Sequence, residues 1–113
     1  MSGSEKQFEN KVKDFLKKNK CWYIKYWGGG DFTKAGIPDL LTCVNGYFLA
    51  IELKSANGKP SELQKTQINL IRNAGGLAII LYPSMFNEFT KLIQSLKKDV
   101  NVYLEQFKFD DTV

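Results

Sequence analysis

The sequence contains no histidine, and Arg72 is the only arginine among its 16 cationic residues. The lack of histidine excludes Ser-His-Asp hydrolysis, zinc sites built on histidine, and nucleases that use a histidine base. Because the other cations are lysines, a nucleic-acid partner would be bound through its phosphates, since reading base edges depends on the bidentate arginine fork. The net charge of +4 agrees with such a partner without establishing one.

Two cysteines, Cys21 and Cys43, are too few for a zinc site and indicate small core residues in a reducing compartment. No apolar run approaches the ~18 residues of a membrane span, and no secretory signal opens the chain. We therefore expect a cytoplasmic protein with no membrane partner and no small-molecule cofactor. The length of 113 residues, with 43% hydrophobic residues, predicts one folded domain over residues 1–113.

The first third of the chain predicts a helix and then a strand. Apolar side chains recur at helical spacing and indicate an amphipathic helix over residues 4–19: Phe8, Val12, Phe15 and Leu16. The aromatic and β-branched residues 21–27 are typical of a strand, which the glycines at 28–30 end. The stretch that continues to Pro38 is expected to be a loop.

The remaining chain predicts a mixed sheet flanked by helices. Apolar runs at 40–44 and 47–53 are joined by Asn45-Gly46, the pair most typical of a type I′ hairpin turn. After them we expect a helix over 61–74 closed by two glycines, a buried strand over 77–82, a helix over 86–98 and an edge strand over 100–107. The order α-β-β-β-α-β-α-β is that of an α/β fold, an α+β sandwich.

The hairpin predicts a pair of facing carboxylates. With a two-residue turn, Val44 faces Tyr47, and five residues further along Asp39 faces Glu52, with Cβ atoms ~5 Å apart. Two like charges there repel, whereas a divalent cation such as Mg²⁺ or Mn²⁺ would bind both. Lys54 lies two residues beyond Glu52 and therefore on the same face of the strand.

This set of side chains suffices for phosphodiester hydrolysis. The cation would polarise a phosphoryl oxygen and acidify a bound water. The backbone carbonyl of Leu53 offers a third oxygen ligand, and Lys54 would position or deprotonate the water or neutralise charge in the transition state. The alternative is that a carboxylate and a lysine at strand ends are ordinary solvated surface residues.

Several motifs in order resemble the PD-(D/E)xK nuclease superfamily and, more narrowly, its small VRR-NUC nucleases, many of which are stand-alone and phage-borne. In that family a G-x-P-D-L-L stretch precedes a hairpin ending in E-x-K, then a loop, S-x-x-Q, and a helix that ends in two glycines before an apolar strand. Here these are residues 36–41, 51–54, 58–59, 61–64, 75–76 and 77–82. The resemblance covers residues 5–83 and implies a restriction-endonuclease-like core.

The resemblance also implies an acidic residue on the first helix and a glutamine near the catalytic lysine. Glu9 fits the acidic position best and would act as a further metal ligand or through water, while Glu5 is the rival and suits the helix dipole. Gln64 carries over as the glutamine. It also completes a capping box with Ser61, and Gln67 on the inner helix face is a second candidate.

The glycine-rich loop before Asp39 is a candidate DNA contact. Glycine lets a backbone approach a phosphate closely, so we expect contacts from Gly29, Gly30, Thr33 and Lys34, joined by Lys59 from the loop after the hairpin. The alternative is a plain connection. The lysines of the last helix indicate a solvated face rather than a DNA surface.

Together these residues predict a metal-dependent endonuclease acting on DNA in recombination and repair. The stand-alone family members are similar to Holliday junction resolvases that act as homodimers, and a two-fold dimer matches a two-fold four-way junction. Flap, fork or nicking activity of the same family is the alternative. A non-catalytic DNA-binding module on the same fold, or a structural protein with a chance E-x-K, are the alternatives from other classes.

Overall fold

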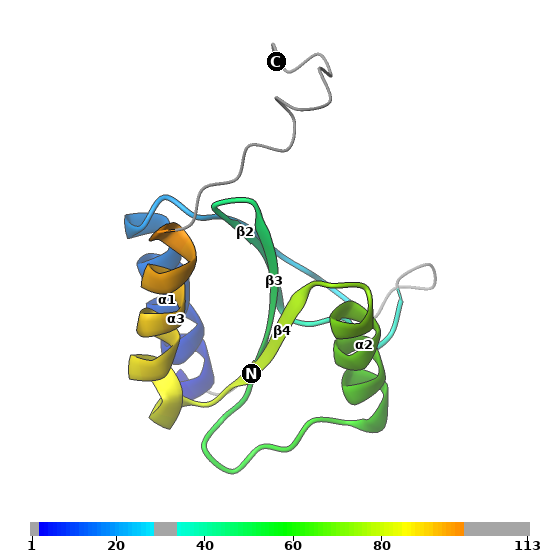
Figure 1. Cartoon of the computed structure of the whole chain (residues 1–113). Helices are drawn as coiled ribbons and strands as arrows, with labels where there is room; N and C mark the ends of the chain where they lie inside the picture. Colours follow the sequence, from blue (N-terminus) through cyan, green and yellow to red (C-terminus); the bar gives the residue numbers. More distant parts are fainter. Residues whose placement is uncertain (1–2, 29–33, 99–113) are drawn as a thin grey trace.

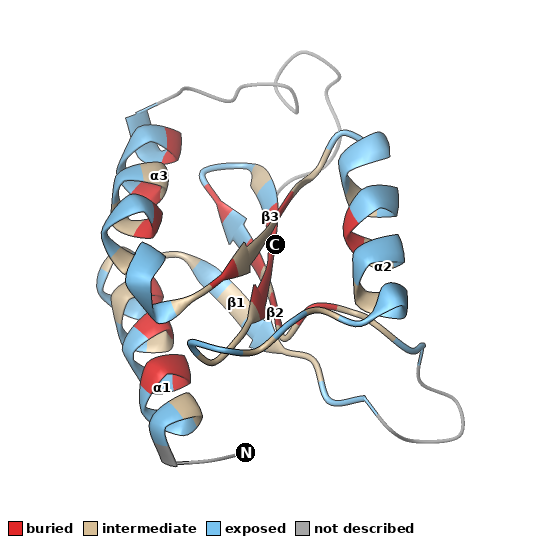
Figure 2. Ribbon diagram, turned by 90° about the horizontal axis from the view of Figure 1, so that it is seen from below, coloured by how far each residue is buried: buried red, intermediate tan, exposed pale blue. Residues whose placement is uncertain are grey.

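A four-stranded sheet lies between two layers of helices in the computed structural model, which describes residues 3–28 and 34–98 (Figure 1). Figures 1 and 2 show two helices on one face, α1 (Gly3–Lys18) and α3 (Phe86–Lys98), and one on the other, α2 (Glu62–Asn73). The strands are β1 (Trp22–Lys25), β2 (Leu40–Val44), β3 (Tyr47–Leu53) and β4 (Leu77–Leu81). No helix among the described residues has the length and apolar character needed to span a membrane.

The sheet is mixed, as the element order predicts. Its strand order is β1-β2-β3-β4, with antiparallel pairs β1–β2 and β2–β3 and a parallel pair β3–β4 connected through α2. The first strand begins one residue later than predicted, because Cys21 N–H bonds the Leu16 carbonyl at the end of α1, and it ends two residues earlier, at Lys25. A short 3-10 helix at Pro83–Met85, which the sequence pattern did not predict, leads into α3. The strand predicted over residues 100–107 lies outside the described residues.

The predicted hairpin has the expected turn and register. Val44 faces Tyr47 and Leu40 faces Ile51, and both turn residues have positive φ, 51° at Asn45 and 88° at Gly46. Positive φ at both central positions is the mark of a type I′ turn. This register brings Asp39, one residue before β2, level with Glu52 of β3.

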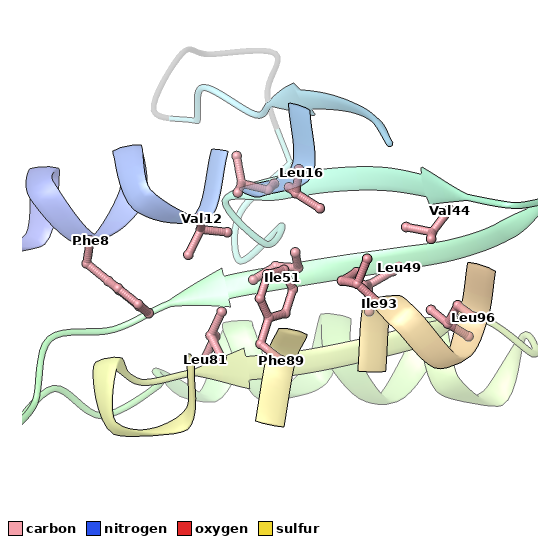
Figure 3. Close-up of a cluster of buried hydrophobic side chains, with 11 residues drawn as sticks. Phe8, Val12, Leu16, Val44, Leu49, Ile51, Leu81, Phe89, Ile93 and Leu96 are labelled. Atoms are coloured by element: carbon pink, nitrogen blue, oxygen red, sulfur yellow. The ribbon is translucent and has the colours of Figure 1, made fainter. Parts of the chain in front are cut away.

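The main core fills the space between the sheet and the pair α1–α3 (Figure 3). Val12 and Leu16 of α1 meet Leu49 and Ile51 of β3 and Ile93 of α3, and all five are fully buried. Burying a side chain of this size stabilises a fold by about 2 kcal/mol. This core holds the first helix against the sheet and so determines where its buried acidic residue lies.

A smaller core lies under α2, where Ile68 packs on Ala50 and Ala78. This helix covers the β3–β4 side of its face and leaves the β1–β2 side open. Cys43 of β2 points to the open side and is exposed, while Cys21 is half-buried. The prediction that both cysteines are core residues is therefore wrong for Cys43, because no helix covers that part of the sheet.

Gly36 anchors the loop that leads to Asp39. It has a φ of +81°, and a Cβ there would lie 2.5 Å from the Leu63 carbonyl oxygen. Gly75 also has positive φ, at +93°, but a Cβ there would meet nothing within 4 Å. We expect Gly36→Ala to lower the free energy of unfolding by about 2 kcal/mol, and Gly75→Ala by about 1 kcal/mol, because only the first adds a clash to the backbone strain. Urea unfolding of the two variants checks this, and equal losses would contradict it.

Candidate active site

Asp39 is held between two strands at one end of the sheet. Its Oδ2 accepts a hydrogen bond from the backbone N–H of Leu53 at 2.8 Å. Its backbone carbonyl accepts one from the N–H of Tyr26, also at 2.8 Å. The side chain is 26% exposed, and its second oxygen, Oδ1, faces the ammonium group of Lys25.

Glu52 lies on β3, and only 3% of the residue is exposed. Its Oε2 accepts a hydrogen bond from Gln64 Nε2 at 3.1 Å and lies 3.2 Å from Lys54 Nζ. Burial, and then the negative charge of Asp39, raise the pKa of Glu52 from 4.5 to about 7, although Lys54 opposes the shift. The part of this shift in pKa that comes from the charge of Asp39 agrees with two neighbouring carboxylates, as the hairpin register predicts.

Lys54 follows β3 directly, and its side chain is 16% exposed. Its backbone N–H donates to the carbonyl of Leu81 at 3.0 Å, so the parallel pairing with β4 continues through this residue. The side chain therefore stays on the same face as Glu52, where the period of the strand predicts it.

Both the oxygen and the nitrogen of the Gln64 side-chain amide form hydrogen bonds. Its Oε1 accepts from the Ser61 N–H at 2.8 Å, while Nε2 reaches Glu52. The capping box that begins α2 is complete. Gln64 therefore caps the helix and contacts Glu52 at the same time. Gln67 is half-buried one turn later, and no hydrogen bond joins it to Glu52 among the described residues.

Glu9 is buried on α1, with 1% of the residue exposed, inside a cluster of lysines. Its carboxylate lies 2.6 Å from Lys25, 2.8 Å from Lys13 and 3.3 Å from Lys6. Burial alone would raise its pKa, but hydrogen bonds from Lys13 and Lys25 and their charges lower the pKa to about 2. Lys25 Nζ also lies 3.7 Å from Asp39 Oδ1, so this ammonium group connects Glu9 to the carboxylate pair.

Lys25 belongs to the site and was not predicted from the sequence. A signal exists in the pattern of β1, where Trp22 and Ile24 are exposed while Tyr23 and Lys25 point inward. A lysine on the inward face of a strand requires a carboxylate partner. Only the packing of α1 against the sheet shows that Glu9 is this partner.

The other predicted residues lie around the site. A pocket of about 160 Å³ opens beside Lys54 and is lined in part by Glu5, Gly58 and Lys59. Glu5 therefore lines the same pocket as Lys54. Lys34 is exposed at the end of the loop, where its backbone N–H donates to the Tyr26 hydroxyl at 3.0 Å. The other predicted loop contacts, Gly29, Gly30 and Thr33, lie outside the described residues.

The donor set fits a hard divalent cation only through Asp39 and Glu52. Oδ2 of Asp39 and Oε2 of Glu52 accept hydrogen bonds, and Oδ1 of Asp39 lies 3.7 Å from Lys25 Nζ, so an ion bound at Oδ1 would compete with this ammonium group. Oxygen donors are what Mg²⁺ prefers. Among residues 3–28 and 34–98, no group of three or more acidic or cysteine side chains forms a metal site. In this structure the cations near Glu9 are Lys6, Lys13 and Lys25. The prediction that Glu9 and the Leu53 carbonyl bind metal stays a prediction.

Comparison with known proteins gives a family, and three solved chains are similar to this one. The model of the archaeal Holliday junction resolvase family (Hjc) matches residues 2–104. The solved structure of Archaeoglobus fulgidus Hjc, a Holliday junction resolvase from an archaeal hyperthermophile, matches with a TM-score of 0.53 and 23% identity, over 68% of this chain and 66% of that one. This chain therefore spans slightly less than two thirds of that protein, and the likeness shows the fold. No curated protein matches the sequence.

Proposed function

The chain belongs to the archaeal Holliday junction resolvase family, and we propose that it is a divalent-metal-dependent endonuclease that cuts four-way DNA junctions as a homodimer. The observation that carries the proposal is the pair Asp39–Glu52 with Lys54 at its side. Two carboxylates that repel each other destabilise a fold, and a bound cation reverses this cost.

Each residue of the site has a distinct part in the proposed hydrolysis. Asp39 and Glu52 would hold a Mg²⁺ or Mn²⁺ ion, which when bound neutralises phosphate charge and acidifies a water. Gln64 fixes the orientation of Glu52 through its hydrogen bond. Lys54, already beside Glu52, positions the attacking water or exchanges a proton with it, and its charge stabilises the pentavalent phosphate of the transition state.

Lys25 supplies a second cation, from β1. The Glu9 carboxylate lies 2.6 Å from the ammonium group of Lys25, and this group lies 3.7 Å from the Asp39 carboxylate. A phosphate that approaches the carboxylates therefore meets lysines from β1 and from the end of β3. In this arrangement Glu9 acts on the reaction through Lys25, as a positioning residue.

Family membership agrees with the predicted PD-(D/E)xK-like nuclease. The assignment of this chain to the VRR-NUC nucleases, a phage origin and a cytoplasmic location stay predictions. The homodimer is part of the proposal because two identical sites related by a two-fold axis can cut two strands of a two-fold junction.

The test is a cleavage assay on a synthetic four-way junction, with duplex, flap, fork and single-stranded DNA of the same sequence as controls. Each substrate is incubated with Mg²⁺, with Mn²⁺ and with chelator. We expect metal-dependent cuts in two opposite strands of the junction. Equal cutting of flap or duplex would retain the site and overturn the junction preference. Binding without any cutting would show a non-catalytic DNA-binding module.

We expect Lys54→Ala to lower the single-turnover rate on the junction by about 100-fold, because removing a group that assists proton transfer costs 10²–10⁴. The matched control is Lys91→Ala, since Lys91 is 72% exposed and pairs only with Glu88 on α3 among the described residues. Junction affinity, measured in chelator, should change little in either variant. An unchanged rate for Lys54→Ala would remove this lysine from the mechanism.

A further inference from the structure

Trp27 lies exposed beside the candidate active site. Among the large hydrophobic residues that are exposed in the described part of the chain, it has the highest exposure, 72%. It directly follows Tyr26, whose backbone N–H donates to the Asp39 carbonyl at 2.8 Å. A single exposed aromatic residue is common on protein surfaces. What distinguishes Trp27 is that its ring is presented to solvent next to a carboxylate of the proposed reaction.

The indole ring contacts the same lysine as the carboxylates of the site. Lys25 Nζ lies 5.3 Å from the centre of the Trp27 ring, 3.7 Å from Asp39 Oδ1 and 2.6 Å from Glu9 Oε1. The first of these contacts is a cation–π interaction, which acts within ~6 Å of the ring centre. Because the buried Glu9 holds the ammonium group, Trp27 is separated from Asp39 by one fixed positive charge.

An aromatic ring next to a cation fits the two parts of a nucleotide. The positive charge of Lys25 attracts a phosphate, and an aromatic side chain binds a base by stacking on its face. Stacking does not depend on base identity, because every base has a π-face. This agrees with a chain that has Arg72 as its only arginine and therefore few groups for reading base edges.

The structure of the DNA decides whether a base is available to Trp27. Inside a continuous duplex each base is covered on both faces by its neighbours, so stacking on a protein ring first requires unstacking, which costs free energy. At the branch point of a four-way junction the stack of base pairs in each arm is interrupted. The last base of an arm can therefore present one face to a ring that lies beside the phosphate backbone.

We propose that Trp27 stacks on a base at the branch point, next to the phosphate that is cut, and that this contact makes the protein prefer branched to continuous DNA. The inference rests on the proposed function and adds to it a residue that determines specificity. In this arrangement Trp27 binds the substrate, while Asp39, Glu52 and Lys54 carry out the hydrolysis. The preference requires no contact with a base edge.

Affinities for a synthetic four-way junction and for a duplex of the same sequence, measured in chelator so that nothing is cut, test this preference. For Trp27→Ala we expect at least 10-fold weaker binding of the junction and duplex binding within about 2-fold of the wild type. Trp27→Phe retains an aromatic face and should restore most of the junction affinity. Since Trp27 is 72% exposed, the urea midpoint should not change in either variant. An unchanged junction affinity, or equal losses on both DNAs as expected if the ring only restrains Lys25, would overturn the proposal.

The fluorescence of the two tryptophans reports the contact directly. Trp22→Phe leaves Trp27 as the only tryptophan, and the matched Trp27→Phe leaves Trp22, which is 61% exposed at the start of β1. At saturating DNA in chelator, we expect the junction to quench Trp27 at least 2-fold more than the duplex does, and both DNAs to affect Trp22 alike. Equal quenching of Trp27 by the two DNAs would overturn the proposal. Junction-specific quenching in a protein that cuts no DNA would retain this contact and reject the nuclease, whereas junction cutting without such quenching would do the reverse.

Discussion

Asp39→Asn is expected to lower metal-dependent junction cleavage by about 10³-fold, which corresponds to ~4 kcal/mol of transition-state stabilisation. Asparagine keeps a side-chain oxygen for the Leu53 N–H, which Asp39 accepts at 2.8 Å. The substitution therefore preserves the hydrogen bond that connects the two strands and removes only the negative charge. The loss should appear as a lower rate at saturating metal together with weaker metal binding.

Single-turnover rates over a range of Mg²⁺ concentrations, with calorimetric titration of Mg²⁺ without DNA, measure both effects. Asp14→Asn on the exposed side of α1 is the matched control. A second readout needs no activity. Because the charge of Asp39 contributes to raising the pKa of Glu52 to about 7, that pKa should fall in Asp39→Asn, as carboxyl NMR can show. Full activity of the variant would exclude Asp39 as a metal ligand.

Glu9→Gln is expected to lower the free energy of unfolding by about 3 kcal/mol at neutral pH. The carboxylate is buried and lies 2.6 Å and 2.8 Å from Lys25 and Lys13. Burial opposes its charge, but the lysines outweigh burial and lower its pKa from 4.5 to about 2. Glutamine has nearly the same shape, so it removes the negative charge that faces Lys6, Lys13 and Lys25 and leaves these lysines less well compensated.

The pH dependence of this loss separates charge from packing. Because the pKa of Glu9 is lower in the folded protein, its stabilisation is complete above about 4.5 and disappears as the pH falls through about 2. Urea unfolding of wild type and variant should therefore give a difference that shrinks between these values. In the control Glu88→Gln, an exposed pair with Lys91, the loss should stay below about 1 kcal/mol. An equal loss for Glu9→Gln at pH 7 and near pH 2 would indicate packing alone.

The geometry of the hairpin formed by β2 and β3 was predictable because it depends on local rules. Asn45-Gly46 requires positive φ at both turn residues, and the two-residue turn determines which residues face each other. The position of Lys54 beside Glu52 follows from the period of the strand. The capping box at Ser61 and Gln64 was predictable for the same reason, since both residues lie within one helical turn.

The partners of Glu9 and Gln64 were not predictable in this way. The contact of Gln64 with Glu52 joins α2 to β3, and the contact of Glu9 with Lys25 joins α1 to β1. Helical periodicity limits Glu9 to the inner side of its helix, but it does not say which strand lies opposite. The environment of Cys43 was also not predictable. This strand residue lies in an apolar run and was expected in the core, but it is exposed.

The sequence by itself determined the order of the helices α1 to α3 and strands β1 to β4, the register of the hairpin and the carboxylate pair with its lysine, because turn geometry and strand period act between residues close in the chain. Only the tertiary structure decided that Lys25 lies between Glu9 and Asp39, and that α2 leaves part of the sheet uncovered. Both depend on how helices pack on a sheet, which is set by the fit of side chains from distant parts of the chain.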